Sequence, residues 1–197
     1  MRKIAALSAA FFACALAGTC VQAAPLPPGR TPAPCRDDAK GRALDFWVGA
    51  WTVTNADGTK AGTNTITRLL NGCAITEEWR GLTPDDVGMS LFTYDARARR
   101  WEQTWVTPDT TRPGSLKHKT MTAMLYANAV RFEGTIRAPG GKSIIDRTTL
   151  TPWRDGRVRQ TIEWSRDGGK SWETRFDAYY NRVGKPDLGA RHGGDPH

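Results

Sequence analysis

The residues of this sequence that are best suited to chemistry are a glutamate and a glutamine placed among tryptophans. Glu77 lies two residues before Trp79, and Gln103 lies midway between Trp101 and Trp105. A buried carboxyl group can hold or transfer a proton, an amide can orient a polar ligand group, and an indole offers a flat apolar surface. This combination indicates a small-molecule site that either binds a ligand or performs acid–base chemistry.

Polar and aromatic residues an even number of positions apart occur again near the C-terminus. Gln160 lies four residues before Trp164, and Tyr180 has the same parity as Phe176 and Trp172. Because side chains alternate between the two faces of a strand, residues of equal parity lie on one face. We therefore predict that Trp172 faces inward and that one interior surface carries the ligand-binding residues Glu77, Trp79, Trp101, Gln103, Trp105, Gln160, Trp164 and Tyr180.

The elements that position these residues are short strands with period-two alternation, joined by turns that contain glycine and asparagine. We predict ten strands, at residues 51–55, 62–70, 73–80, 88–95, 100–107, 118–126, 129–137, 143–152, 158–165 and 172–182. Hairpin connections favour a meander over a Greek key, and barrel closure removes exposed edges. The predicted fold is all-β, a ten-stranded antiparallel up-and-down β-barrel with a short helical turn at residues 42–48 before it.

Three functions are open for such a barrel. A barrel of this width is not readily filled by side chains alone, so the first is a cavity that binds a small hydrophobic or aromatic ligand. The second is an enzyme of isomerase, hydratase or decarboxylase type, with Glu77 as the acid or base and its pKa raised by burial. The third is a filled barrel with a structural or interaction role. We favour binding because the pattern assigns no second titratable group to the interior, and the face of Asp146 is ambiguous.

The first residues are typical of an export signal. A basic start at Arg2 and Lys3 precedes an uncharged apolar run and small residues that end at Ala23. The apolar run is shorter than the roughly 20 residues that span a bilayer, so we expect no stable membrane insertion after cleavage. The predicted organisation is a signal peptide at 1–23, a proline-rich arm at 24–41, the barrel at 42–183 and a flexible tail at 184–197, in a periplasmic or secreted protein.

Two of the four cysteines remain once the signal peptide is removed. Cys14 and Cys20 fall within residues 1–23, which leaves Cys35 and Cys73. In an oxidising compartment a single pair is typical of one disulfide, and two buried free thiols are the alternative. We predict a Cys35–Cys73 bond that stabilises the fold by roughly 2–4 kcal/mol.

Charge and the remaining motifs argue against several other classes of protein. The net charge is +8, but acidic residues are interleaved with the basic ones, so we expect no nucleic-acid partner. His118 is the only histidine within residues 42–183, and the cysteines lack zinc-site spacing. The sequence also lacks a G-x-S-x-G nucleophile motif and a glycine-rich phosphate loop. We therefore expect no metal and no cofactor, and the oligomeric state stays open.

Four blocks of the sequence resemble one bacterial family. Residues 44–53, LDFWVGAWTV, are similar to the opening FDFWVGEWDV motif of the family called domain of unknown function 1579. Residues 71–79 resemble its second block, residues 94–105 its third and residues 167–172 its last. Ala50 stands where the family usually has glutamate, so any chemistry that depends on that glutamate would be missing here.

The resemblance implies a calycin-like barrel, of the type found in lipocalins and nitrobindins, and a small ligand. Gly49 and Trp51 are similar to the calycin signature, in which the tryptophan closes one end of the barrel. The family has no established activity, so the resemblance implies a fold and a kind of partner but no reaction.

Overall fold

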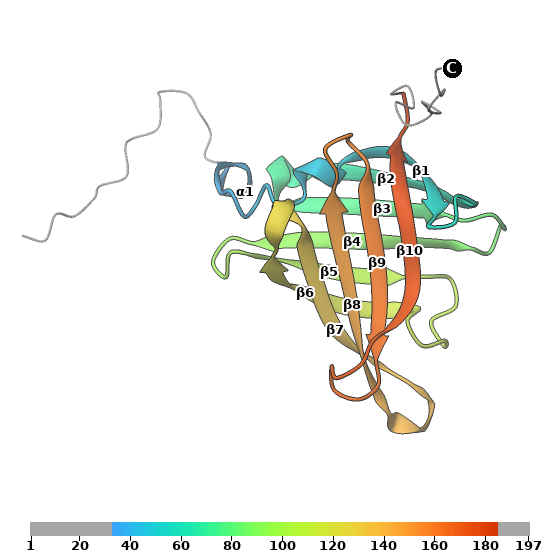
Figure 1. The fold of residues 1–197 in the computed structure, drawn as a ribbon. Helices are drawn as coiled ribbons and strands as arrows, with labels where there is room; N and C mark the ends of the chain where they lie inside the picture. The colour runs from blue at the N-terminus through green and yellow to red at the C-terminus, as the bar shows by residue number, and fades with distance from the viewer. Residues whose placement is uncertain (1–32, 185–197) are drawn as a thin grey trace, which may run out of the picture. The chain divides into compact units, whose positions relative to one another are not determined.

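The computed structural model of the chain describes residues 33–184, which form a closed antiparallel barrel (Figure 1). Its strands are β1 (Gly49–Asn55), β2 (Lys60–Leu69), β3 (Ala74–Arg80), β4 (Val87–Asp95), β5 (Arg100–Val106), β6 (Leu116–Met124), β7 (Val130–Arg137), β8 (Ser143–Pro152), β9 (Val158–Ser165) and β10 (Glu173–Arg182). Each strand pairs with the next along the chain, and β1 pairs with β10 to close the barrel. The predicted ten-stranded up-and-down β-barrel is therefore confirmed. The predicted signal peptide, half of the proline-rich arm and most of the tail lie outside the described residues.

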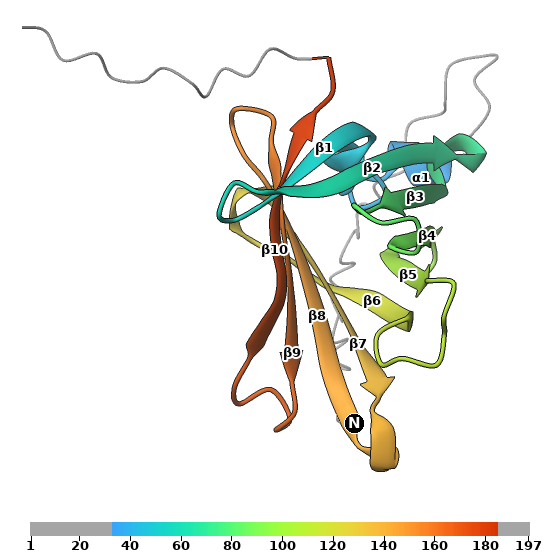
Figure 2. The same ribbon diagram turned by 90° about the vertical axis from the view of Figure 1, so that its right-hand side faces the viewer.

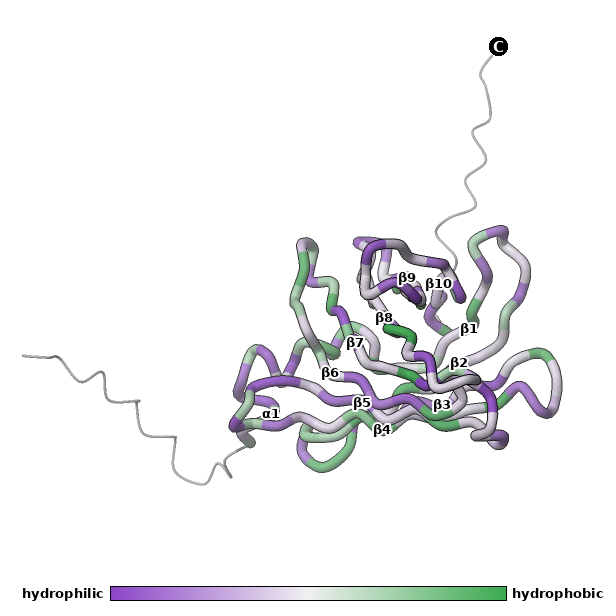
Figure 3. The backbone as a smooth tube through the Cα atoms, turned by 90° about the horizontal axis from the view of Figure 1, so that it is seen from below, coloured by the Kyte–Doolittle hydropathy of each residue, from purple (hydrophilic) through white to green (hydrophobic). Residues whose placement is uncertain are grey.

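The strands of the barrel run in markedly different directions around its wall. Figure 1 shows β7–β10 side by side, running steeply across β2–β5 behind them. The turned view in Figure 2 separates these two parts of the wall. Buried and exposed residues alternate along the strands, for example along β2, and this is the pattern of a sheet with one face buried. The tube in Figure 3 shows both hydrophilic and hydrophobic residues in the barrel wall.

The short helices lie near the start of the barrel and in its turns. Helix α1 (Pro34–Asp37) falls within the predicted arm, and the 3-10 turn η1 (Asp45–Trp47) falls within the predicted helical turn at 42–48. The remaining 3-10 turns are η2 (Leu70–Gly72), η3 (Tyr126–Asn128) and η4 (Pro139–Gly141). They connect β2 with β3, β6 with β7 and β7 with β8.

The turn between β2 and β3 is longer than the two-residue hairpin turn that Asn71 and Gly72 predict. Leu70, Asn71 and Gly72 all have positive φ, at 48°, 53° and 95°. A Cβ at Gly72 would also lie 2.5 Å from the Cγ of Arg36, so glycine is required here both by backbone conformation and by space.

An aromatic core fills one end of the barrel. Its largest fully buried side chains include Trp47, Trp51, Trp101, Tyr180, Phe92 and Phe132. Trp47 meets the ring of Phe92 edge-on at 5.4 Å, and Phe92 meets Phe132 in the same way at 5.5 Å. The Trp51 indole donates a hydrogen bond to the carbonyl oxygen of Trp47 at 2.9 Å, and the Arg182 guanidinium lies over the Trp51 ring. Trp51 therefore packs in the aromatic core at this end of the barrel.

A disulfide attaches α1 to this end of the barrel. Cys35 is bonded to Cys73, which precedes β3, so the predicted pairing is confirmed. Asp38 adds a second attachment, since its carboxylate accepts hydrogen bonds from Arg99 and from the hydroxyl of Tyr94. The described part of the predicted arm is thus packed against the barrel and covers one end of it.

Candidate functional site

The other half of the barrel contains a cavity of about 440 Å³. Six of the eight predicted ligand-binding residues line it: Glu77, Trp79, Gln103, Trp105, Gln160 and Tyr180. Further lining residues come from β6, β8, β9 and β10, and they include Lys117, Lys119, Thr148, Ile162 and Phe176. Strand alternation therefore placed most of the predicted ligand-binding residues on the cavity wall.

Trp101 and Trp164 are not among the residues that line this cavity. Trp101 is fully buried in the aromatic core, and its indole donates to the carbonyl oxygen of Lys40 at 3.0 Å. It has the same parity as Trp105, but four residues of strand separate the two by about 13 Å. The indole of Trp164 donates to a carboxylate oxygen of Asp146 at 2.8 Å. The first of these tryptophans closes the barrel, and the second supports a buried carboxylate.

Strand parity predicted the wrong face for Trp172. The pairing of β10 with β9 shifts between Thr174 and Phe176, where β10 has a bulge. Because a bulge adds one residue, it reverses the faces of the residues beyond it. Trp172 consequently lies on the outside of the barrel, where the guanidinium of Arg147 is 3.4 Å from the centre of its ring.

Glu77 lies at the centre of a hydrogen-bonded chain that crosses four neighbouring strands. Its Oε1 accepts a hydrogen bond from the amide of Asn64 on β2 at 2.8 Å, and its Oε2 accepts one from the hydroxyl of Ser90 on β4 at 2.7 Å. Ser90 in turn accepts a hydrogen bond from the amide nitrogen of Gln103 on β5 at 3.0 Å. The barrel therefore supplies a donor to each oxygen of the buried carboxyl group.

Burial raises the pKa of Glu77 above its ordinary value. The hydrogen bonds from Ser90 and Asn64, and the positive charges of Lys119 and Lys117, oppose this effect without cancelling it. Glu77 consequently holds its proton to a higher pH than an exposed glutamate does.

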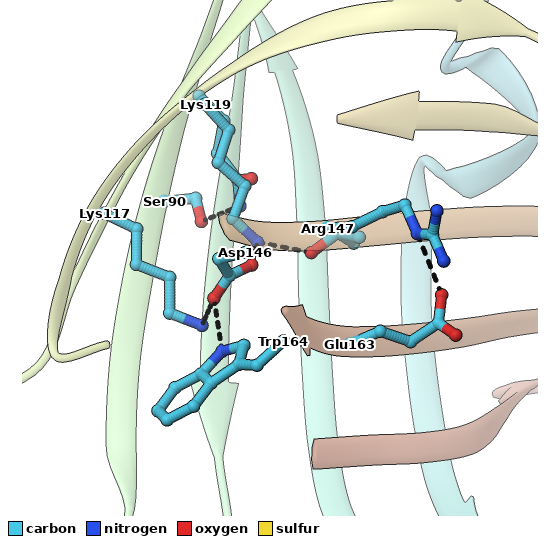
Figure 4. Close-up of polar contacts among 9 residues, drawn as sticks. Ser90, Lys117, Lys119, Asp146, Arg147, Glu163 and Trp164 are labelled. Carbon is cyan, nitrogen blue, oxygen red and sulfur yellow. Dashed lines mark hydrogen bonds and ion pairs between the residues drawn. The ribbon is translucent and has the colours of Figure 1, made fainter. Parts of the chain in front are cut away.

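A second polar cluster lies on β6, β8 and β9, next to the first because Lys119 pairs with Gln103, and its centre is the fully buried Asp146 (Figure 4). Its Oδ2 is 3.0 Å from the Nζ of Lys117, and its Oδ1 contacts the Nζ of Lys119. Lys119 also donates to the hydroxyl of Thr148. With the indole of Trp164, the two lysines surround the Asp146 carboxylate with donors, as Figure 4 shows.

The pKa values of this cluster are consistent with an ion pair. Burial acts to raise the pKa of Asp146, but the charges of Lys119 and Lys117 outweigh burial and hold it below the ordinary value. Burial also lowers the pKa of Lys119 to about 8, although Asp146 opposes that change. Asp146 is therefore an anion near neutral pH, and the pKa of Lys119 lies closer to neutrality than that of an ordinary lysine.

Glycine at position 134 lets this cluster form across a strand. Gly134 on β7 pairs with Asp146 on β8, and β7 lies between β8 and β6, the strand of Lys119. A Cβ at Gly134 would lie 2.0 Å from the carbonyl oxygen of His118 and 3.2 Å from the Cα of Lys119. A side chain would therefore not fit, and its absence leaves room for the lysine to reach the carboxylate.

Tyr180 and Gln160 complete the polar part of the cavity. The Tyr180 hydroxyl donates to the Oε1 of Gln160 at 2.5 Å. Burial, together with the nearby charge of Glu77, raises the pKa of Tyr180 well above its ordinary value, so the phenol is neutral. This pair can orient a polar group of a ligand but does not supply a charge.

The outer part of the cavity is aromatic and aliphatic. The rings of Trp79 and Phe176 meet edge-on at 6.0 Å, and Ile162 lies beside Phe176 in the strand pairing. Trp105 lies against Gly88, where a Cβ would come within 2.4 Å of the indole. The exposed side chains of Lys60 and Asp86 also line the cavity and add two charges to this outer part. An apolar wall next to a polar interior suits an amphipathic small molecule.

Sequence reasoning missed Lys117, Lys119, Asn64, Ser90 and Thr148, and it left the face of Asp146 open. The structure places all of these side chains on the inner face of the barrel. The missed signal for the lysines is their parity with Met121, which is buried on β6. The predicted strand began at residue 118, whereas β6 begins at Leu116, so Lys117 was assigned to the preceding loop.

Within residues 33–184, no group of three or more His, Cys, Asp or Glu side chains is placed to hold a metal ion. In the same residues, no helix has the length and apolar character needed to cross a membrane. No family model matches the sequence, and a search of the curated proteins finds no match.

Proposed function

We propose that this chain is a binding protein for a small hydrophobic or aromatic molecule, which it holds inside the barrel. The observation that carries the proposal is the cavity of about 440 Å³ with an aromatic entrance and convergent polar groups at its inner end. This volume falls within the range of about 300–1,000 Å³ that is typical of small-molecule sites. The chemistry of the lining matches a ligand with an apolar body and a polar end.

The division of the barrel into two halves supports binding over a purely structural role. Trp47, Trp51 and Trp101 pack the end that α1 covers, and their packing provides a rigid base. Trp79 and Trp105 lie near the C-terminal ends of β3 and β5, away from this core, and border the cavity. The tryptophans therefore divide into a core set and a cavity set, whereas a filled barrel needs only the first.

An enzyme that uses Glu77 as acid or base is the second candidate. It is favoured by one observation: Glu77 and Lys119 both line the cavity, and the pKa of Glu77 is raised while that of Lys119 is lowered to about 8. Such a pair suits proton transfer of the isomerase, hydratase or decarboxylase type. Binding ranks first because both oxygens of Glu77 already accept hydrogen bonds from the barrel.

We also propose that the chain belongs to the domain of unknown function 1579 family and acts in the periplasm or outside the cell. Its partner there is a small molecule, not a nucleic acid or a bilayer. The Cys35–Cys73 disulfide supports export, because disulfides persist in oxidising compartments. Fractionation of expressing cells, with the mature N-terminus read by mass spectrometry, tests this proposal. Full-length chain confined to the cytoplasm would contradict it.

Binding is tested with the neutral dye N-phenylnaphthylamine, whose fluorescence rises in apolar surroundings. The wild-type barrel is expected to bind the dye, and Trp105→Ala to bind it at least about tenfold more weakly, because one wall of the cavity is removed. Trp153→Ala is the matched control, since Trp153 is 41% exposed and does not line the cavity. No dye binding by the wild type, or an equal loss in both variants, would contradict the proposed function.

A further inference from the structure

The charged residues that line the cavity differ in how readily they can bind a charged ligand. Glu77, Lys117 and Lys119 line the interior of the cavity, and the exposed Lys60 and Asp86 line it as well. Asp146 contacts both interior lysines but does not itself line the cavity. The oxygens of Asp146 contact both ammonium groups and the indole of Trp164. The two lysines, and not the carboxylate that they share, therefore border the space that a molecule in the cavity would occupy.

Glu77 does not provide an equivalent anionic site. Its two oxygens accept hydrogen bonds from Asn64 and Ser90, and burial favours its protonated form. A cationic ligand would have to compete with these donors for the carboxylate. It would also meet the like charges of Lys117 and Lys119 inside the same low-dielectric cavity.

The two lysines have more positive charge and more hydrogen-bond donors than their contacts within the barrel use. Two ammonium groups share one carboxylate, so this wall carries one positive charge that Asp146 does not balance. An ammonium group has three hydrogens to donate. Among the described residues, Lys119 donates to Asp146 and Thr148, and the polar contact of Lys117 is with Asp146.

We propose that the ligand is an organic monoanion, an aromatic or apolar carboxylic acid whose carboxylate binds the ammonium groups of Lys117 and Lys119. The apolar body of the ligand then lies against Trp105, Phe176 and Ile162 nearer the entrance. This inference rests on the proposed binding function and narrows it to one chemical class. One negative charge matches the one unbalanced positive charge of the lysine wall.

The experiment compares three ligands that share one apolar skeleton: cinnamate, cinnamamide and cinnamylamine. Each is titrated against wild-type protein by calorimetry and by displacement of N-phenylnaphthylamine. Cinnamate is expected to bind at least about tenfold more tightly than the neutral amide, because a charge-assisted hydrogen bond is made only by the acid. Cinnamylamine is expected to bind most weakly of the three.

Lys117→Met tests whether the preference for the acid comes from this wall. The change is expected to lower cinnamate affinity about tenfold and to leave cinnamamide affinity unchanged, which reduces the acid-to-amide ratio. Lys142→Met removes a lysine from an exposed position between β7 and β8, so it controls for the loss of one positive charge. It is expected to preserve the ratio of the wild type.

The outcomes separate this inference from the proposed function. Dye binding by the wild type with equal affinity for acid and amide, or with tighter binding of the amine, overturns the anion proposal and leaves the binding function standing. An acid preference that survives in Lys117→Met also overturns it. Absence of binding for the dye and all three ligands overturns both. The comparison on the wild-type protein decides the question even if Lys117→Met does not fold.

Discussion

Lys119 and Asp146 form an ion pair inside the barrel, across the intervening strand β7. Their side chains are 2% and 0% exposed, so both charges have been removed from water. Such a pair stabilises a protein only if each charge is well matched, because desolvation costs several kcal/mol per ion. The additional contacts that offset this cost come from Lys117, Thr148 and the indole of Trp164.

Asp146→Asn is expected to destabilise the fold by about 3–5 kcal/mol, because it leaves two buried ammonium groups without their anion. The free energy of unfolding, measured by urea denaturation, is the readout. Asp155→Asn is the control, since Asp155 pairs with Arg157 at a largely exposed position. A second Lys119→Met substitution in Asp146→Asn should restore part of the stability. An Asp146→Asn protein as stable as the control would contradict the buried pair.

Trp51→Ala is expected to destabilise the protein by about 3–5 kcal/mol, because a fully buried indole is removed from the closed end of the barrel. The change also removes the hydrogen bond to the Trp47 carbonyl oxygen and the contact with Arg182. Thermal and urea denaturation measure the loss, with the exposed Trp153→Ala as the control. An unchanged unfolding curve would mean that Trp51 does not support the core.

The sequence was sufficient to predict the inward face of several strands but not the depth of a residue along the barrel. Parity placed Glu77, Gln103 and Tyr180 inside, because alternation is a local property of the extended chain. Parity also grouped Trp101 with Trp105, although one packs in the core and the other borders the cavity. Depth depends on strand tilt and register, which pairing across the whole barrel determines.

Two features were not predicted from the local pattern. The bulge that turns Trp172 outward has no distinctive residue type at the point where the pairing shifts, between Thr174 and Phe176. Lys119 shares the parity of the buried Met121, but lysine is a residue type that usually faces solvent, and its burial depends on the ion pair with Asp146 two strands away. Alternation within one strand does not reveal which charged residue on another strand will be its partner.

Reduction of the Cys35–Cys73 disulfide is expected to lower the free energy of unfolding by roughly 2–4 kcal/mol, because the bond closes a loop across 38 positions of the chain. Exported protein without residues 1–23 should show no free thiol under denaturing, non-reducing conditions. Cys35→Ser with Cys73→Ser serves as the permanently reduced comparison. Two free thiols per chain in the exported protein would contradict the prediction.

Glu77 is expected to make the stability of the protein depend on pH in a defined direction. Burial raises the pKa of Glu77 in the folded state, so folding favours its protonated form. The resulting stabilisation is complete below the unfolded value of about 4.3 and is lost as the pH rises through the folded pKa. Glu77→Gln keeps a neutral side chain at every pH, so its stability relative to wild type should increase from about pH 4 upward.

Urea denaturation of both proteins across a series of pH values measures this difference. Glu78→Gln is the matched control, because Glu78 is the exposed neighbour on the outer face of the same strand. Glu78→Gln measures how removal of an exposed carboxylate changes the free energy of unfolding at each pH. That change is subtracted from the change measured for Glu77→Gln. A Glu77→Gln protein whose stability relative to wild type falls as the pH rises would show that the Asn64 and Ser90 hydrogen bonds outweigh burial, and that Glu77 is held in the barrel as an anion.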